Sequence, residues 1–162
     1  MASKNILLWS TLGLLGLAPK ALADAHLYWG AGGSPDKEHY KHMRISLEAD
    51  QNLGNGLEAG LTFTLIPRHT PGGFINGGGL MKEIDVQTGV NARKRYGNFF
   101  ITPNVNITTA EEGDPFLSAG LGLGLHLNDH LEIRWDYQRN FSAGIHQDYP
   151  EHMMTSSIGF NF

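Results

Sequence analysis

Residues 117–127 read Leu-Ser-Ala-Gly-Leu-Gly-Leu-Gly-Leu-His-Leu, and this stretch decides the fold. Every second position from Leu117 to Leu127 is Leu or Ala, whereas the positions between them are Ser, Gly or His. Successive side chains of a strand point to opposite faces. The stretch therefore predicts a strand with one apolar face and one face of small or polar groups.

The next run, residues 131–138, repeats this alternation with charged residues. Leu, Ile, Trp and Tyr share one face, and Glu132, Arg134, Asp136 and Gln138 share the other. Such strands separate two different media, which are either a core and water or lipid and a polar lumen. The alternation alone leaves both arrangements open.

Eight alternating runs follow one another along the chain, with turn or loop chemistry between them. They cover residues 26–33, 42–50, 57–65, 80–93, 99–108, 117–127, 131–138 and 152–162. Consecutive alternating runs predict an antiparallel meander. Pro103 weakens the fifth run, because proline donates no hydrogen bond to a ladder. The predicted fold class is an all-β, eight-stranded antiparallel up-and-down transmembrane β-barrel.

The connections alternate in length, as expected when tight turns gather at one end of a barrel and longer loops at the other. Tight turns are predicted at residues 51–56, 94–98 and 128–130. The long loops include residues 66–79 and 139–151, and these are the candidate sites for an external ligand, because binding residues often lie on loops of a rigid scaffold.

The first segment has the features of a cleaved signal peptide. Lys4 precedes an apolar run over residues 6–18, and Ala21-Leu22-Ala23 matches a small-x-small cleavage site. We expect residues 1–23 to be removed and residues 24–162 to form one outer-membrane barrel domain. The chain ends on Phe162 within an alternating run, so no further domain is expected after the barrel.

Composition excludes some classes of partner. The chain has 12 basic and 16 acidic residues and a net charge of −4, which argues against a nucleic-acid partner. It has no cysteine, so an exported domain would need another source of stability than disulfides. A closed barrel, in which neighbouring strands pair every backbone group, supplies one.

Three features favour lipid over water outside the barrel. The polar faces mix glycines with charges of both signs, which suits a narrow lumen filled by side chains. Aromatic residues lie near the ends of the runs, as in interfacial girdles. The last run also continues to the final residue, whereas soluble domains often fray there. The alternative is a soluble, lipocalin-like carrier with its apolar face inside.

The last two runs resemble the final hairpin of the OmpA-type outer-membrane barrels. Arg134-Trp135-Asp136-Tyr137-Gln138 and the ending 157–162, Ser-Ile-Gly-Phe-Asn-Phe, carry the resemblance. Phe160 stands where that family usually has Tyr, and the size is similar to OmpX-like barrels. The resemblance implies a bacterial outer-membrane location, contact with lipid and lipopolysaccharide, and an assembly signal at Phe160 and Phe162 that the outer-membrane assembly machinery reads. It does not imply cell-wall anchoring, because the chain ends with the barrel.

Charged residues on the polar faces form the candidate site, a polar network in the lumen. The predicted members are Arg44, Glu48, Glu58, Glu83, Asp85, Arg93, Glu132, Arg134 and Asp136. A salt-bridged plug is the favoured interpretation, because eight strands enclose a space that side chains fill. The alternative is a narrow, porin-like ion-conducting pore gated by the same charges. Arg134 is expected to lie near the centre.

Catalysis, cofactors and metals are not expected. Lipid-A deacylases of this barrel type place His two residues before a catalytic Ser, but Asn140 holds that position relative to Ser142. His146 and Glu151 lie nearby without the required spacing, so no residue is predicted to be catalytic. The loop histidines, among them His39, His42, His69 and His152, form no compact ligand motif. The favoured function is therefore a structural or surface-interaction role through the external loops.

Overall fold

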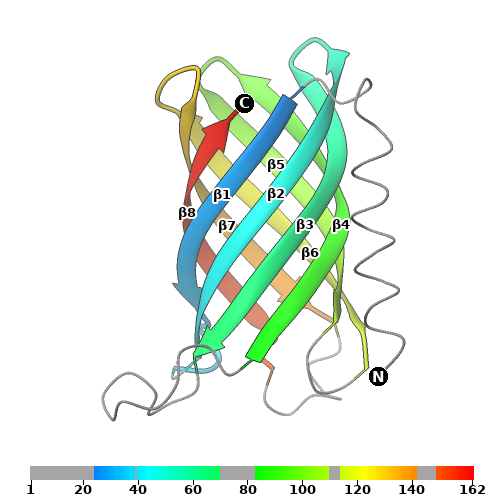
Figure 1. The fold of residues 1–162 in the computed structure, drawn as a ribbon, viewed down its shortest axis with the longest axis vertical. Helices are drawn as coiled ribbons and strands as arrows, with labels where there is room; N and C mark the ends of the chain where they lie inside the picture. Colours follow the sequence, from blue (N-terminus) through cyan, green and yellow to red (C-terminus); the bar gives the residue numbers. More distant parts are fainter. Residues whose placement is uncertain (1–23, 39, 70–82, 110–113, 142–148) are drawn as a thin grey trace.

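The computed structural model describes residues 24–38, 40–69, 83–109, 114–141 and 149–162, which form eight strands (Figure 1). The strands are β1 (Asp24–Gly33), β2 (Lys41–Gly54), β3 (Leu57–His69), β4 (Glu83–Tyr96), β5 (Phe99–Thr109), β6 (Phe116–His126), β7 (Leu131–Asn140) and β8 (His152–Asn161). The predicted signal peptide lies outside the described residues. Within the described ranges, no helix is long and apolar enough to cross a bilayer.

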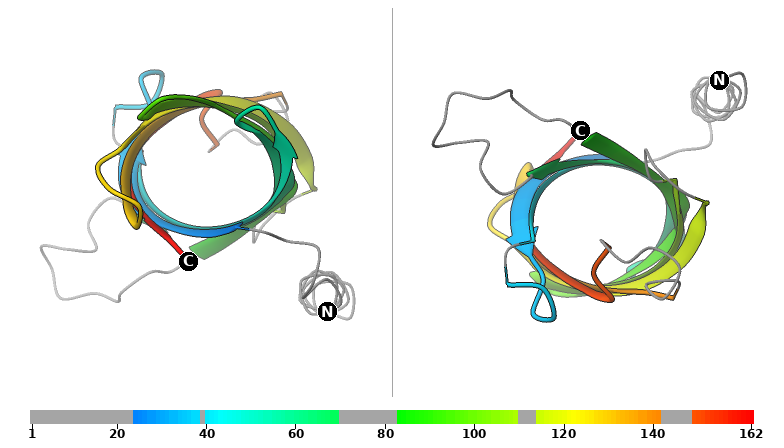
Figure 2. Two further views of the ribbon diagram at one scale, coloured as in Figure 1. Left: turned by 90° about the horizontal axis from the view of Figure 1, so that it is seen from above. Right: turned by 90° about the horizontal axis from the view of Figure 1, so that it is seen from below.

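Each strand pairs with its neighbour in sequence, and β8 pairs with β1 to close the barrel (Figure 2). All the pairings are antiparallel, and the closing register runs from His26 opposite Asn161 to Gly33 opposite Met154. Closure leaves no free sheet edge, so the strands satisfy one another's backbone groups. This confirms the predicted up-and-down topology.

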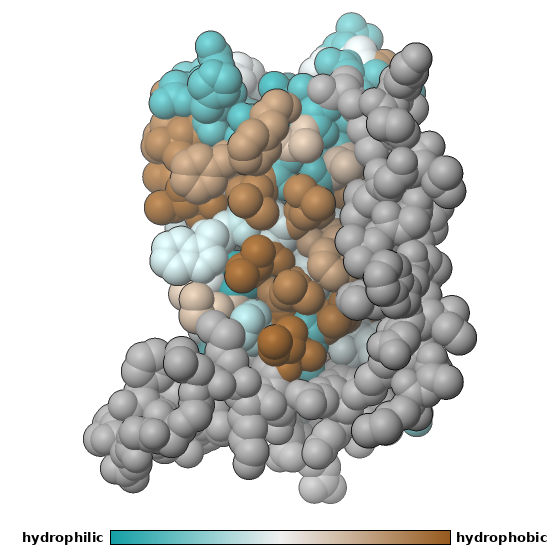
Figure 3. Space-filling view, viewed as in Figure 1, coloured by the Kyte–Doolittle hydropathy of each residue, from teal (hydrophilic) through white to brown (hydrophobic). Residues whose placement is uncertain are grey.

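Apolar side chains form the outer wall of the barrel. Leu121, Leu123, Trp29 and Trp135 are 44, 40, 57 and 51% exposed, and the residues between them on the same strands point inward. Figure 3 shows apolar residues along the visible wall and hydrophilic ones at the end with the short turns. This is the arrangement of a transmembrane barrel, whereas a lipocalin-like barrel would have its apolar face inside. The soluble-carrier alternative is therefore wrong.

The short turns are tighter than the sequence suggests. Strand β2 continues through Gly54 and β4 through Tyr96, so Asn55-Gly56 and Gly97-Asn98 alone connect these hairpins. Asn55 and Gly56 have φ values of 54° and 69°, a region that Asn and Gly tolerate better than other residues. These turns lie at the top of Figure 1, with the start of β1 and the end of β8.

Pro103 is accommodated inside β5 at a small cost in pairing. It lies opposite Leu121 of β6, and its side chain faces outward. Pairing with β4 is interrupted between Asn91–Asn104 and Lys94–Ile101, with the same register on both sides of the gap. The gap is explained by the missing proline N–H, which removes one donor toward β4. The predicted fifth strand is confirmed.

Candidate functional site in the barrel lumen

The inward faces of the strands bury the predicted charged residues in the lumen. Asp85 lies apart from the others, at the long-loop end of β4. These residues are at most 6% exposed, and they come from β2, β3, β4 and β7: Arg44, Glu48, Glu58, Asp85, Arg93, Glu132, Arg134 and Asp136. Glu83 begins β4, but its side chain lies outside the described part. Buried charges at this density need mutual pairing, because each carries a large desolvation cost.

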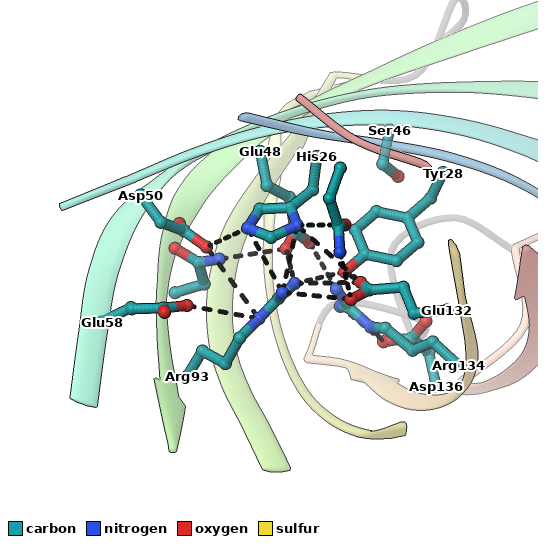
Figure 4. Close-up of polar contacts among 12 residues, drawn as sticks. His26, Tyr28, Ser46, Glu48, Asp50, Glu58, Arg93, Glu132, Arg134 and Asp136 are labelled. Atoms are coloured by element: carbon teal, nitrogen blue, oxygen red, sulfur yellow. Dashed lines mark hydrogen bonds and ion pairs between the residues drawn. The ribbon is translucent and has the colours of Figure 1, made fainter. Parts of the chain in front are cut away.

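Arg93 has the most charged neighbours in this set (Figure 4). Its Nη2 lies 3.2 Å from Glu48 Oε2 and 3.4 Å from Glu132 Oε1, and it donates a hydrogen bond to the Tyr28 hydroxyl. Its guanidinium carbon lies 4.5 Å from the centre of the Phe100 ring. The side chain therefore bridges β1, β2, β5 and β7 across the lumen.

Arg134, the residue expected at the centre, forms the second bridge. Its Nη1 donates to Glu48 Oε1 at 2.6 Å, and its Nη2 lies 2.7 Å from Asp136 Oδ1. Glu48 thus binds Arg93 through one oxygen and Arg134 through the other. Arg44 extends the chain of charges, with Nη1 3.8 Å from Asp136 Oδ2. The two arginines share one carboxylate and form a single network.

Glycines on the inward faces make room for the large side chains, as the sequence indicates. A Cβ at Gly122 would lie 2.6 Å from Arg134 Nε, and one at Gly124 would overlap the Phe100 ring. At Gly159 it would lie 2.5 Å from Tyr28 Cε1. The lumen is therefore filled by pairing a bulky residue on one strand with glycine on another.

Toward the long-loop end, the lumen contains mainly neutral hydrogen-bonding groups. Thr62 donates to Asn106 at 2.9 Å, and Gln87 donates to Thr108 at 2.8 Å. The His42 ring lies 2.8 Å from the Thr155 hydroxyl, and this predicted loop histidine is therefore a buried lumen residue. Each of these groups makes a side-chain hydrogen bond, but Gln87 Oε1 and His42 Nδ1 find no second partner among the described residues.

An apolar cluster lies in the lumen beside the long loops. Ile66, Phe116, Tyr149 and Met153 are at most 4% exposed and pack together, with Tyr40 against them. The alternation places Ile66, Phe116 and Met153 on the inward faces, where the sequence suggests polar side chains. The sequence shows these three as isolated exceptions in their strands, so it gives no sign that they meet.

The first and last long connections are joined at this end. Asp36 accepts hydrogen bonds from the backbone N–H groups of Glu151 at 2.7 Å and His152 at 3.2 Å, and also from the Ser34 hydroxyl. Slight burial raises the pKa of Asp36, but the hydrogen bonds from Ser34 and the backbone outweigh it, so the pKa lies below its usual value. The ionised form of Asp36 therefore ties the β1–β2 connection to the start of β8.

Several residues of the network are absent from the predicted set. His26, Tyr28 and Asp50 are at most 2% exposed in the lumen, next to Arg93. All three occupy the inward-facing positions of their strands, so the alternation alone is sufficient to predict that they lie in the lumen. Asn161 is also inward and lies 2.6 Å from the His26 ring.

The other residues named in the sequence analysis lie mostly at the surface or outside the described ranges, and Asn140 is the buried exception. His39, Ser142 and His146 are outside the described residues, and so is the side chain of His69. His152 contacts the Tyr137 hydroxyl at 2.7 Å, and Glu151 pairs with Arg139 at 2.7 Å. Phe160 and Phe162 are 47% and 76% exposed at the short-turn end. Asn140 is buried and donates to the Pro150 carbonyl.

Comparison with known proteins supports the fold. No family model matches the chain, and no curated protein matches it. Neisserial surface protein A matches with a TM-score of 0.57 and 10% identity, over 85% of this chain and 93% of that one. A de novo designed transmembrane β-barrel matches with a TM-score of 0.56 and 9% identity, over 87% and 97%. At this identity the likeness shows the eight-stranded transmembrane barrel fold, and the OmpA-type resemblance stays a prediction.

Proposed function

We propose that this protein is an integral barrel of the bacterial outer membrane with a structural role, which presents its long-loop end for surface interactions. The observation that carries the proposal is the filled lumen. Buried ion pairs around Arg93 and Arg134 cross it, and an apolar cluster lies in it beside the long loops. A barrel of this size has room for packed side chains in place of a wide channel. External contacts are then left to the loops and the lipid-facing wall.

The outer wall supports contact with lipid and lipopolysaccharide. Exposed apolar residues alternate with buried polar ones along each strand, and Trp29 and Trp135 lie among them. Phe160 and Phe162, on the outer wall beside the start of β1, are proposed as the signal for the assembly machinery. The same proposal assigns no catalytic role to the chain, and an unchanged lipid-A mass profile after expression would agree with this.

Fractionation of expressing cells tests the location. We expect the protein in the outer-membrane fraction, with a gel mobility that changes when the sample is boiled in detergent. Recovery as a soluble periplasmic protein with no mobility change would contradict the proposal. Planar-bilayer recordings distinguish the structural role from the alternative of an ion-conducting pore. A steady single-channel conductance would show an open path through the lumen.

A further inference from the structure

Three lumen side chains from three strands converge beside Arg93. His26 of β1, Asp50 of β2 and Glu58 of β3 each offer one ligand atom, and these atoms all lie within 4.8 Å of one another (Figure 4). The three residues are at most 2% exposed. Sequence spacing does not reveal the set, because its members meet only when the strands pair. An imidazole with two carboxylates is a donor set that suits Zn²⁺ and related divalent ions.

The hydrogen bonds of Asn161 determine which nitrogen of His26 is free. Asn161 Nδ2 donates to Glu132 Oε2 at 3.3 Å, so the amide oxygen Oδ1 is the atom that lies 2.6 Å from His26 Nδ1. Because that oxygen only accepts, Nδ1 carries the proton and Nε2 has the lone pair in the neutral ring. Metal-binding histidines commonly have this support, with the distal N–H held by a carbonyl oxygen.

The free nitrogen of His26 faces a carboxylate. His26 Nε2 lies 3.7 Å from Asp50 Oδ2, and two acceptors at this distance repel unless a cation or a proton lies between them. Arg93 Nη1 lies 3.1 Å from Nδ1 and 3.3 Å from Nε2. Because Nδ1 carries a proton, Arg93 Nη1 donates to Nε2, and this hydrogen bond is long at 3.3 Å. An ion bound at Nε2 would take its place.

Three carboxylate oxygens of the cluster accept no hydrogen bond from the described residues, namely both oxygens of Asp50 and Glu58 Oε2. The fourth, Glu58 Oε1, lies 2.9 Å from Arg95 Nη2. Arg93 Nε lies 4.0 Å from both Asp50 Oδ2 and Glu58 Oε2, and it has no hydrogen-bond partner within the described ranges. Arg93 makes its short contacts through Nη2 on the opposite side, with Glu48 and Glu132. An ion at the cluster would not disturb those contacts.

The charge balance of the network also leaves room for a cation. Leaving aside Asp85 at the long-loop end of β4, five buried carboxylates face four guanidinium groups: Glu48, Asp50, Glu58, Glu132 and Asp136 against Arg44, Arg93, Arg95 and Arg134. One negative charge is thus in excess when the histidines are neutral. Asp50 is the carboxylate of this set without a close cationic partner.

We propose that His26 Nε2, Asp50 and Glu58 bind a divalent transition-metal ion of the Zn²⁺ type at the short-turn end of the lumen. Two ligands of tetrahedral zinc are about 3.4 Å apart when the bonds are about 2.0–2.1 Å long. The 3.7 Å between His26 and Asp50 is close to this value, and Glu58 approaches by a side-chain rotation. The Arg95 side chain is 34% exposed, and its Nη2 lies 2.9 Å from Glu58 Oε1. An ion that enters from the short-turn side would pass this side chain.

Titration of the folded barrel with Co²⁺ and Zn²⁺ tests this proposal. The protein is purified in detergent, stripped with a chelator and titrated, with Co²⁺ followed by its visible absorption and Zn²⁺ by competition. We expect one ion per barrel, and at least a tenfold loss of affinity in each of the variants His26→Gln and Asp50→Asn. The matched controls are His42→Gln and Asp136→Asn, which change a lumen histidine and a lumen carboxylate outside the cluster.

A second variant tests the tautomer argument. Asn161→Leu leaves all three ligands in place but removes the oxygen that holds Nδ1–H, and loss of such support typically lowers metal affinity by about 10- to 100-fold. Gel mobility before and after boiling verifies that every variant is folded. No binding by the folded parent would overturn the proposal, and so would equal binding by the parent and His26→Gln, which would place the ion elsewhere.

Discussion

At the scale of single residues, Arg93 has the largest electrostatic role. Its neighbours include Glu48, Glu132, Asp50 and Glu58, and none of these carboxylates is exposed by more than 2%. Arg93→Met would leave buried negative charge uncompensated. We expect the free energy of unfolding to fall by about 3–5 kcal/mol. Urea titration of the refolded barrel in detergent, followed by tryptophan fluorescence, measures this change.

The next residue supplies the control for that experiment. Lys94 is on the opposite face of β4, and its ammonium donates to the Asn55 carbonyl near the turn. Lys94→Met removes the same charge from an exposed hydrogen bond, so the effect should stay below about 1 kcal/mol. Equal losses of unfolding free energy in both variants would show that the buried contacts of Arg93 contribute no more to stability than an exposed hydrogen bond.

The glycine at position 124 permits the close approach of Phe100. A Cβ there would overlap the ring, which is fully buried beneath the Arg93 guanidinium. Gly124→Ala should therefore cost about 1–3 kcal/mol through overpacking. Adding Phe100→Leu should recover part of the loss, because the two changes share one space. Purely additive losses in the same urea titration would refute this packing argument.

At the scale of elements, Asp36 fastens the β1–β2 connection to the start of β8. Its lowered pKa means that ionised Asp36 contributes stability above the pKa of the unfolded chain and loses it as pH falls through the folded value. We expect the amides of Glu151 and His152 to exchange faster at acidic pH, after correction for intrinsic exchange rates. Asp36→Asn should show the faster exchange already at neutral pH.

Glu38 provides the comparison for this local contact. It is an exposed acidic residue of the same connection. Glu38→Gln should leave the exchange of both amides and its dependence on pH unchanged. A pH dependence that persists in Asp36→Asn would assign the titration to another group.

The elements also show how far the sequence predicts this structure. The period-two pattern predicts that the eight strands form and which side chains of each strand point inward, because one face must be apolar where the other is polar. The pattern does not predict where β2 and β4 end, because these strands continue through polar residues near the short turns. Asn52 and Arg95 are examples of polar residues that still pair with the neighbouring strand. The lumen contacts follow only in part. Parity places His26 inside, but its contacts with Asp50 and Glu58 depend on the register of three strands.

At the scale of the whole molecule, the barrel reverses the usual placement of polar and apolar groups. A network of charged side chains is buried in the lumen, and large apolar side chains cover the outside. Such a molecule is stable only where the outside contacts hydrocarbon, because water would hydrate the wall unfavourably. The outer wall is therefore the feature on which the membrane location depends.

The depth dependence of a charge on this wall tests the membrane location. Leu121 lies midway along β6, whereas Leu127 follows the end of that strand at the short-turn end, and they are 44% and 50% exposed. In a bilayer, Leu121→Arg should cost about 2–4 kcal/mol and Leu127→Arg about 0–1 kcal/mol. Unfolding by denaturant in phospholipid vesicles measures both. Two outward leucines of similar exposure would respond alike in water, so equal and small losses in vesicles would mean that no hydrocarbon layer surrounds the middle of the barrel.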